Sequence, residues 1–194
     1  MLRMRYSDTV EEQQGAGRTM PATSVILVGT IVAMAVLQMH WPSPLEFGRA
    51  KPDLLLLLVL YFAFTGGPEK AIGIGLLAGF LEDMLSAGPL GLNIFCKVLL
   101  GYTVGVVSTR LITEHPVVMT SIAFLATVCQ TALLILLSFL HRDGVPVGFM
   151  FLHVGIPMAL YNSLLAPLCF YGMDRLFTRA PTRAPLRGEG LQHE

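Results

Sequence analysis

Long apolar runs, separated by short polar or glycine- and proline-containing segments, dominate the hydropathy pattern of this chain. The runs are Ala22 to Met39, Asp53 to Thr65, Ala71 to Leu85, Asn93 to Leu111, Val117 to Leu140, and a last one within Gly148 to Phe177. A helix needs about 20 apolar residues to cross a bilayer core. The pattern therefore predicts an all-α, polytopic transmembrane helix bundle of about six spans.

The second run is the shortest, because Pro52 precedes it and Gly66, Gly67 and Pro68 follow it. At about 1.5 Å per residue it falls short of a bilayer core of about 30 Å. Three interpretations stay open: the run crosses with little tilt, it thins the bilayer locally, or it pairs with the third run as a re-entrant hairpin. In the last run, we expect Pro157 in the first turn of a helix, where its missing N–H is harmless.

Composition supports a membrane protein. Hydrophobic residues make up 54% of the chain, charged residues only 13%, and the mean hydropathy is +0.65. These values exceed the apolar share of a soluble domain. Residues 1–21 form a polar segment of mixed charge, residues 22–177 the bundle with an uncleaved first span, and residues 178–194 a polar tail that we expect to be disordered.

Basic residues set the expected orientation, because cytoplasmic loops are enriched in Lys and Arg. Six spans with a cytoplasmic N-terminus place nine of them inside: Arg3, Arg5, Arg18, Lys70, Arg110, Arg175, Arg179, Arg183 and Arg187. Three lie opposite: Arg49, Lys51 and Arg142. Both termini are therefore predicted to be cytoplasmic. The net charge of +0 gives no reason to expect nucleic acid as a partner.

Small residues recur every four positions in two consecutive runs and lead to opposite charges. In the third run the small residues are Ala71, Gly75 and Gly79, and the acid Asp83 follows at the same spacing. In the fourth run the base Lys97 comes first, and Gly101 and Gly105 follow at the same spacing. Residues four apart share one face of a helix. Small residues on such a face let two helix backbones approach closely in a membrane. The pattern predicts a tightly packed seam with an acid and a base near one end.

Asp83 is the strongest candidate for a special role, because an ionised group in or beside a span is costly. We favour an ion pair with Lys97 that holds the third and fourth helices together. The alternative is that Asp83 caps the backbone of the turn that follows it, which contains Gly88, Pro89 and Gly91. Glu82 lies on another face of the helix, so the two acids are not expected to contact the same neighbour.

Catalytic motifs are missing from the sequence. It contains no HExxH, GxSxG or GxxxxGK[ST] pattern, and Cys96, Cys129 and Cys169 are too irregularly spaced for a CxxC site. Gln130 and Asn162 lie within spans, where an interhelical hydrogen bond is the expected role. We expect no enzymatic activity, cofactor or metal.

The order and spacing of several short motifs resemble one bacterial family. The motifs are Lys51-Pro52-Asp53, Gly75, Gly79-Phe80-Leu81 with Asp83, Gly88-Pro89-Leu90-Gly91, Gly101-Tyr102, and Asn162 with Ala166-Pro167. Together they resemble the rod shape-determining protein MreD over roughly residues 24–177. The resemblance adds Asp53, Gly91 and Asn162 to the candidate structural or interaction residues.

The resemblance implies a multi-pass inner-membrane component of the cell-elongation machinery that synthesises peptidoglycan. Its implied partners are MreC, the actin-like MreB, RodZ, and RodA with its class B penicillin-binding protein. It also implies a fold similar to the substrate-binding subunits of energy-coupling-factor transporters, and no enzymatic activity.

Two functions from different classes follow. One is a non-enzymatic scaffold whose small-residue faces receive partner helices, chiefly MreC. The other is a substrate-binding subunit of a small-molecule, vitamin-type transporter. A solute site needs several convergent polar groups, and the expected interior offers few beyond Asp83, Lys97, Gln130 and Asn162. The sequence favours the scaffold.

Overall fold

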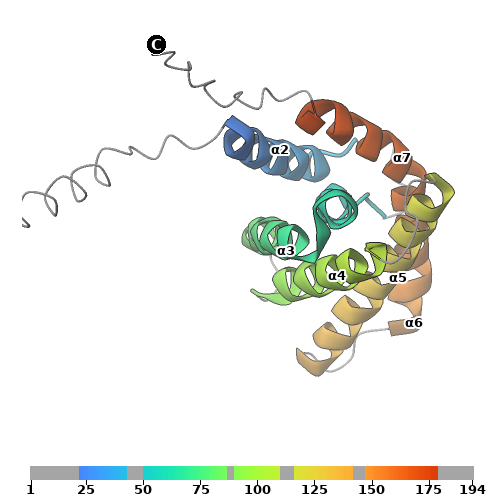
Figure 1. The fold of residues 1–194 in the computed structure, drawn as a ribbon. Helices are drawn as coiled ribbons and strands as arrows, with labels where there is room; N and C mark the ends of the chain where they lie inside the picture. The colour runs from blue at the N-terminus through green and yellow to red at the C-terminus, as the bar shows by residue number, and fades with distance from the viewer. Residues whose placement is uncertain (1–21, 43–49, 87–89, 110–115, 142–146, 179–194) are drawn as a thin grey trace, which may run out of the picture.

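The computed structural model describes residues 22–42, 50–86, 90–109, 116–141 and 147–178. Every regular element in these ranges is helical (Figure 1): α2 (Ala22–Met39), α3 (Leu54–Leu85), α4 (Leu92–Ser108), α5 (Pro116–His141), α6 (Val147–Met150), the π-helical turn η2 (Phe151–Gly155) and α7 (Ile156–Thr178). The predicted all-α class is confirmed. The predicted segment 1–21, and the predicted tail beyond Thr178, lie outside the described residues.

α3 changes direction at Gly67, which divides it into two arms, residues 54–66 and 68–85. Gly67 has φ 74° and ψ −175°, a conformation that is costly for any residue with a side chain. Pro68 cannot donate the backbone hydrogen bond of a continuous helix. Along a straight helix, Asp53 and Glu82 would lie about 43 Å apart, yet both contact Lys97. The predicted break between the second and third runs is therefore confirmed, and the two arms fold back as a hairpin.

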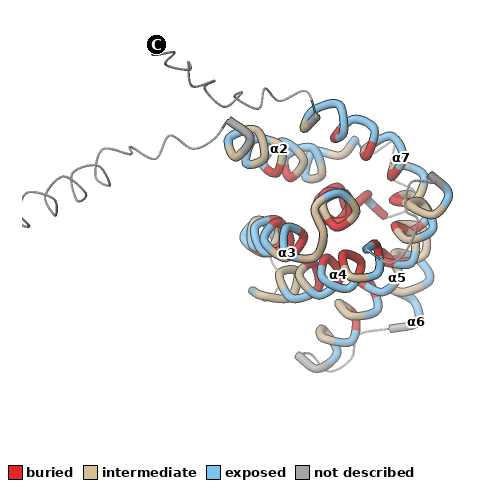
Figure 2. The backbone as a smooth tube through the Cα atoms, viewed as in Figure 1, coloured by how far each residue is buried: buried red, intermediate tan, exposed pale blue. Residues whose placement is uncertain are grey.

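The first arm of α3 is the central element of the bundle. All of residues 54–61 are buried, and most are fully enclosed. Its sequence offers no polar face, as expected for a helix that is surrounded on all sides. Figure 2 shows this buried interior between α2, α4, α5 and α7.

α4 packs against both arms of α3 through glycines. A Cβ atom at Gly79 would lie 2.5 Å from Ile94 Cα, and one at Gly105 would lie 2.6 Å from Pro68 Cα. At Gly101 a Cβ atom would meet Val59 Cγ1 at 2.9 Å and the carbonyl oxygen of Ala71 at 3.1 Å. The close approach predicted from the small-residue spacing is present. The chain's own helices fill these faces, so they are not free for partner helices.

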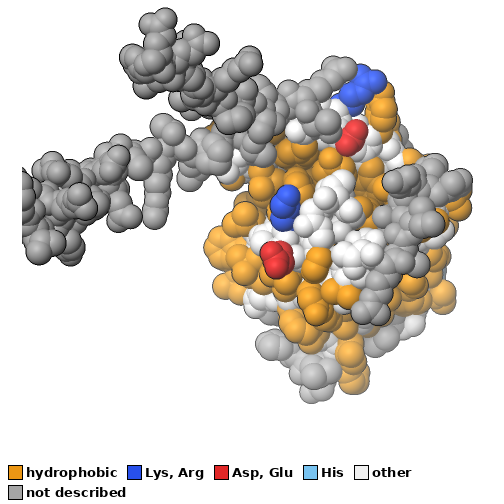
Figure 3. All heavy atoms as spheres, viewed as in Figure 1, with side chains coloured by type: hydrophobic (Ala, Val, Ile, Leu, Met, Phe, Trp, Pro, Cys, Tyr) orange, Lys and Arg blue, Asp and Glu red, His pale blue; other side chains and the backbone are white. Residues whose placement is uncertain are grey.

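Among the described residues, three helical segments are long and apolar enough, by length and composition, to span a membrane: Leu54–Leu85, counted across its reversal at Gly67, Val117–Phe139 and Gly148–Phe177. Ser24–Met39 and Leu92–Ser108 are shorter apolar helices. Apolar side chains cover much of the face shown in Figure 3. Large apolar side chains such as Val32, Leu125 and Leu164 are exposed, as expected for a surface that faces lipid. The chain is a helical membrane protein, and six spans stay a prediction.

The last apolar run begins as α6, widens into η2 and continues as α7. Pro157 is the second residue of α7, but α6 and η2 precede it without a break, so the prediction that it lies in the first turn of the last helix is wrong. The π-helical turn was not predicted. It ends at Gly155, where a Cβ atom would lie 2.7 Å from Thr131 Cγ2 of α5, so the turn brings the last helix close to its neighbour.

Candidate functional site

A buried ionic centre joins the two arms of α3 to α4. The Nζ atom of Lys97 lies 2.8 Å from Asp53 Oδ2 and also forms an ion pair with Glu82 Oε2. The Lys97 side chain has 0% relative exposure, against 4% for Asp53 and 19% for Glu82. Charges removed from water in this way require close partners, because an unpaired buried charge is strongly destabilising.

Asp53 reaches this centre because it caps the first arm of α3. Its Oδ1 atom accepts a hydrogen bond from the backbone N–H of Leu56 at 2.7 Å, which satisfies one of the free donors at a helix start. Its Oδ2 atom is then left to accept from Lys97 and from Gln130 Nε2 of α5. One carboxylate therefore links α3, α4 and α5.

Gln38 of α2 connects the first helix to the same centre. Its Oε1 atom accepts hydrogen bonds from the backbone N–H groups of Leu54 at 3.0 Å and Leu55 at 3.4 Å. Its Nε2 atom donates to Glu82 Oε1 at 3.1 Å. Gln38 was not among the predicted site residues, although an amide side chain in an apolar helix was a signal that could have identified it.

Asn162 of α7 completes the network. Its Oδ1 atom accepts from the backbone N–H of Asp53 at 2.9 Å, and its Nδ2 atom donates to Thr127 Oγ1 of α5 at 3.1 Å. The expectation that Gln130 and Asn162 make interhelical hydrogen bonds is confirmed. The network thus ties α2, both arms of α3, α4, α5 and α7 together around Asp53.

The favoured ion pair between Asp83 and Lys97 is wrong. Asp83 accepts instead from the backbone N–H groups of Gly91 (2.8 Å), Asn93 (3.1 Å) and Ile94 (3.3 Å), and from Asn93 Nδ2 (2.9 Å). It caps the turn and the start of α4, as the alternative proposed. Gly91 has φ 97° in this turn, a conformation favourable to glycine.

The register of the glycine seam explains this outcome. Gly75 lies against Lys97 and Gly79 against Ile94, so α4 runs antiparallel to the second arm of α3. One helical turn beyond Gly79, Asp83 therefore lies opposite Gly91 rather than Lys97. Glu82 points about 100° away from Asp83 around the helix and forms the ion pair with Lys97. The expectation that the two acids have different neighbours is correct, although the ion pair with Lys97 belongs to Glu82, for which no partner was predicted.

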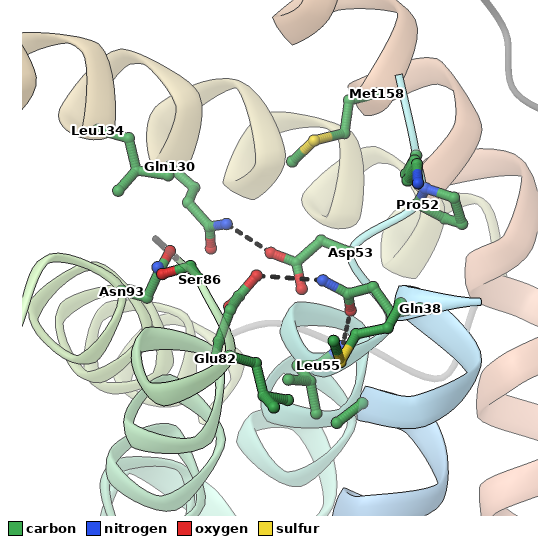
Figure 4. Close-up of a pocket in the computed structure, with 14 residues that line it drawn as sticks. Gln38, Pro52, Asp53, Leu55, Glu82, Ser86, Asn93, Gln130, Leu134 and Met158 are labelled. Carbon is green, nitrogen blue, oxygen red and sulfur yellow. Dashed lines mark hydrogen bonds between the residues drawn. The ribbon is translucent and has the colours of Figure 1, made fainter. Parts of the chain in front are cut away.

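A cavity of about 430 Å³ lies beside the ionic centre (Figure 4). Gln38, Asp53, Glu82 and Gln130 form its polar floor, and Ser86 and Asn93 lie on the side of the turn after α3. Its other walls are mainly apolar: Ala35, Met39, Leu55, Leu85, Leu134 and Met158. Within the described residues, no group of three or more His, Cys, Asp or Glu side chains could hold a metal ion.

Comparison with known proteins agrees with this architecture. The helical bundle, the apolar exterior and the buried polar network define a polytopic membrane protein. The family model of the rod shape-determining protein MreD matches residues 20–179. The chain belongs to the MreD family, and so to the proteins that determine rod shape in bacteria. No curated protein matches the chain.

Proposed function

We propose that this chain is a non-enzymatic scaffold of the cell-elongation machinery in the bacterial inner membrane. It binds MreC and links it to the wall synthases, RodA with its class B penicillin-binding protein, and to MreB and RodZ. The proposal rests on family membership and on the buried network around Asp53, which ties several helices into one unit. The side chains of that network bond to each other and to backbone groups, as expected for a structural role.

The proposal includes six spans with both termini in the cytoplasm. The basic residues support it, because most of the lysines and arginines fall on one side in that topology. The similarity of fold to substrate-binding subunits of energy-coupling-factor transporters stays a prediction from the resemblance.

A partner helix requires an outward face, because the seam glycines are already covered. α2 has such a face. Val25 and Gly29 are exposed, Ala33 follows at the same spacing, and a Cβ atom at Gly29 would meet nothing within 4 Å. Small residues four apart favour helix association in membranes. We propose this face for the single-pass helix of MreC.

Co-purification tests the proposal. The chain is isolated in mild detergent from a rod-shaped bacterium, and associated proteins are identified and quantified by mass spectrometry. Gly29→Leu is compared with Gly73→Leu, a matched change at another exposed helical glycine with open space around it. We expect MreC with the wild type and with Gly73→Leu, and at least about tenfold less with Gly29→Leu, which corresponds to a binding loss of about 1.4 kcal/mol.

Equal recovery of MreC from both variants would exclude the α2 face. The cavity favours a second function, a substrate-binding subunit of a small-molecule transporter, because polar groups converge at its floor. Failure to recover MreC from the wild type, together with a tightly held water-soluble solute, would favour that function over the scaffold.

A further inference from the structure

The floor of the cavity contains a buried acceptor that no group satisfies. Gln130 is 1% exposed, and its Oε1 atom has no hydrogen-bond partner among the described residues. Figure 4 shows its amide facing the space bounded by Asp53, Glu82 and Asn93. A buried polar atom without a partner is unfavourable, so its presence in a folded protein calls for a specific reason.

The orientation of this amide follows from its neighbour. Gln130 Nε2 contacts Asp53 Oδ2, which also accepts from Lys97. An ionised carboxylate only accepts hydrogen bonds, so the nitrogen of the amide must face Asp53 and the oxygen must face away. An occupant of the cavity that contacts Gln130 Oε1 therefore has to donate a hydrogen bond.

The ionic centre favours a positively charged donor. Asp53, Glu82 and Lys97 have two negative charges and one positive charge between them. Both carboxylate residues line the cavity, whereas Lys97 is fully enclosed behind them. A protonated amine next to Gln130 would meet an unsatisfied acceptor and an excess of negative charge at short range, where the interaction is screened little.

The walls indicate that the amine belongs to an amphiphile. Met39 of α2 and Leu85 of α3 line the cavity and are 51% and 44% exposed, so the cavity is continuous with the apolar exterior. Lys51 also lines the cavity, is exposed, and supplies a positive charge that suits a phosphate. The lining of the cavity therefore offers matching surroundings to an amine, a phosphate and apolar chains.

We propose that this cavity binds the head group of an aminophospholipid such as phosphatidylethanolamine. The ammonium donates to Gln130 Oε1 and lies near Asp53 and Glu82, the phosphate lies toward Lys51, and the acyl chains leave past Met39 and Leu85. The cavity volume of about 430 Å³ falls within the usual range for ligand sites, about 300–1,000 Å³.

Lipid-dependent thermal stability tests the site. The full chain is purified in detergent, and its unfolding midpoint is measured with added phosphatidylethanolamine, phosphatidylcholine or phosphatidylglycerol of identical acyl chains. We expect phosphatidylethanolamine to raise the midpoint by several degrees more than the other two, because a ligand stabilises the state that binds it. Phosphatidylcholine has no N–H donor, and phosphatidylglycerol has no positive charge.

Two variants separate this site from general lipid effects. Leu134 lines the cavity, so Leu134→Trp should fill it and abolish the preference for phosphatidylethanolamine. Leu136 lies on the same helix outside this cavity and is 55% exposed, so Leu136→Trp should retain the preference. Gln130→Met removes the acceptor and should also abolish the preference. Equal midpoints with phosphatidylethanolamine and phosphatidylcholine, or a preference that survives Leu134→Trp, would overturn the proposal. An equal rise with ethanolamine alone would assign the cavity to a soluble amine and overturn the lipid assignment.

Discussion

Replacement of Lys97 by methionine is the sharpest test of the buried ionic centre. Methionine keeps an unbranched apolar chain of similar length but removes the ammonium that contacts Asp53 and Glu82. Two carboxylates would then face one another in a site where Asp53 is 3% exposed. Gln38 and Gln130 donate one hydrogen bond each to this pair, which does not replace the lost positive charge.

The expected cost follows from measured buried ion pairs. Removal of one partner costs about 3–5 kcal/mol, because the other charge is left without compensation. For a chain of this size, 1 kcal/mol corresponds to about 2–4 °C in the unfolding midpoint. Lys97→Met should therefore lower the midpoint by about 6–20 °C.

The assay is thermal unfolding of the purified chain in one detergent, with Lys70→Met as the matched control at an exposed lysine. A neutral triple variant, Asp53→Asn, Glu82→Gln and Lys97→Met, should recover most of the loss. In Asp53→Asn, Oδ1 still accepts from Leu56, and an amide nitrogen replaces Oδ2, so the Gln130 amide turns and its Oε1 atom accepts from that nitrogen. Glu82→Gln keeps Oε1 as the acceptor for Gln38, and no charge is left unpaired. A loss from Lys97→Met no larger than that from Lys70→Met would refute the reasoning, as would a triple variant that is less stable than the single one.

Three further predictions concern the backbone and the topology. Gly79→Leu should reduce the yield of folded protein far more than Leu76→Ala. A Cβ atom at Gly79 would lie 2.5 Å from the α4 backbone, whereas Leu76 is 50% exposed. Similar yields from the two variants would refute the close packing of α3 against α4. Gly67→Ala should cost about 1–3 kcal/mol of stability through its positive φ, and an unchanged unfolding midpoint would contradict the reversal of α3. Cysteine at Ser86, with the native cysteines replaced, should react with an impermeant reagent in intact cells; reaction only after permeabilisation would reverse the predicted orientation.

Much of the fold follows from local sequence signals. The first helix has the predicted bounds, Ala22–Met39, because its apolar run ends clearly in polar residues and proline. The break near Gly67 was predictable because glycine and proline disfavour a continuous helix. The four-residue spacing of Gly75, Gly79, Gly101 and Gly105 was enough to predict the α3–α4 seam, since only small residues allow such contact.

The partners within the polar network were not predictable in the same way. Asp53 and Lys97 are 44 positions apart, and their contact depends on the angle at which α3 reverses. Whether Glu82 or Asp83 contacts Lys97 depends on the register of α4 against the second arm of α3, because neighbouring residues of a helix point about 100° apart. Side-chain type identified Lys97, Gln130 and Asn162 as notable, and the family resemblance added Asp53, but three-dimensional packing decides which of them meet.

Cell shape in a rod-shaped bacterium that lacks its own MreD tests the central claim most directly. The wild type, Lys97→Met and the neutral triple variant are expressed, and cell shape is scored together with the amount of each protein in the membrane. If the ionic centre is structural and the protein is a scaffold, the triple variant restores rods although it has no charge at Asp53, Glu82 or Lys97. Round cells that contain the triple variant at the wild-type amount would contradict this, because they would assign those charges a chemical role.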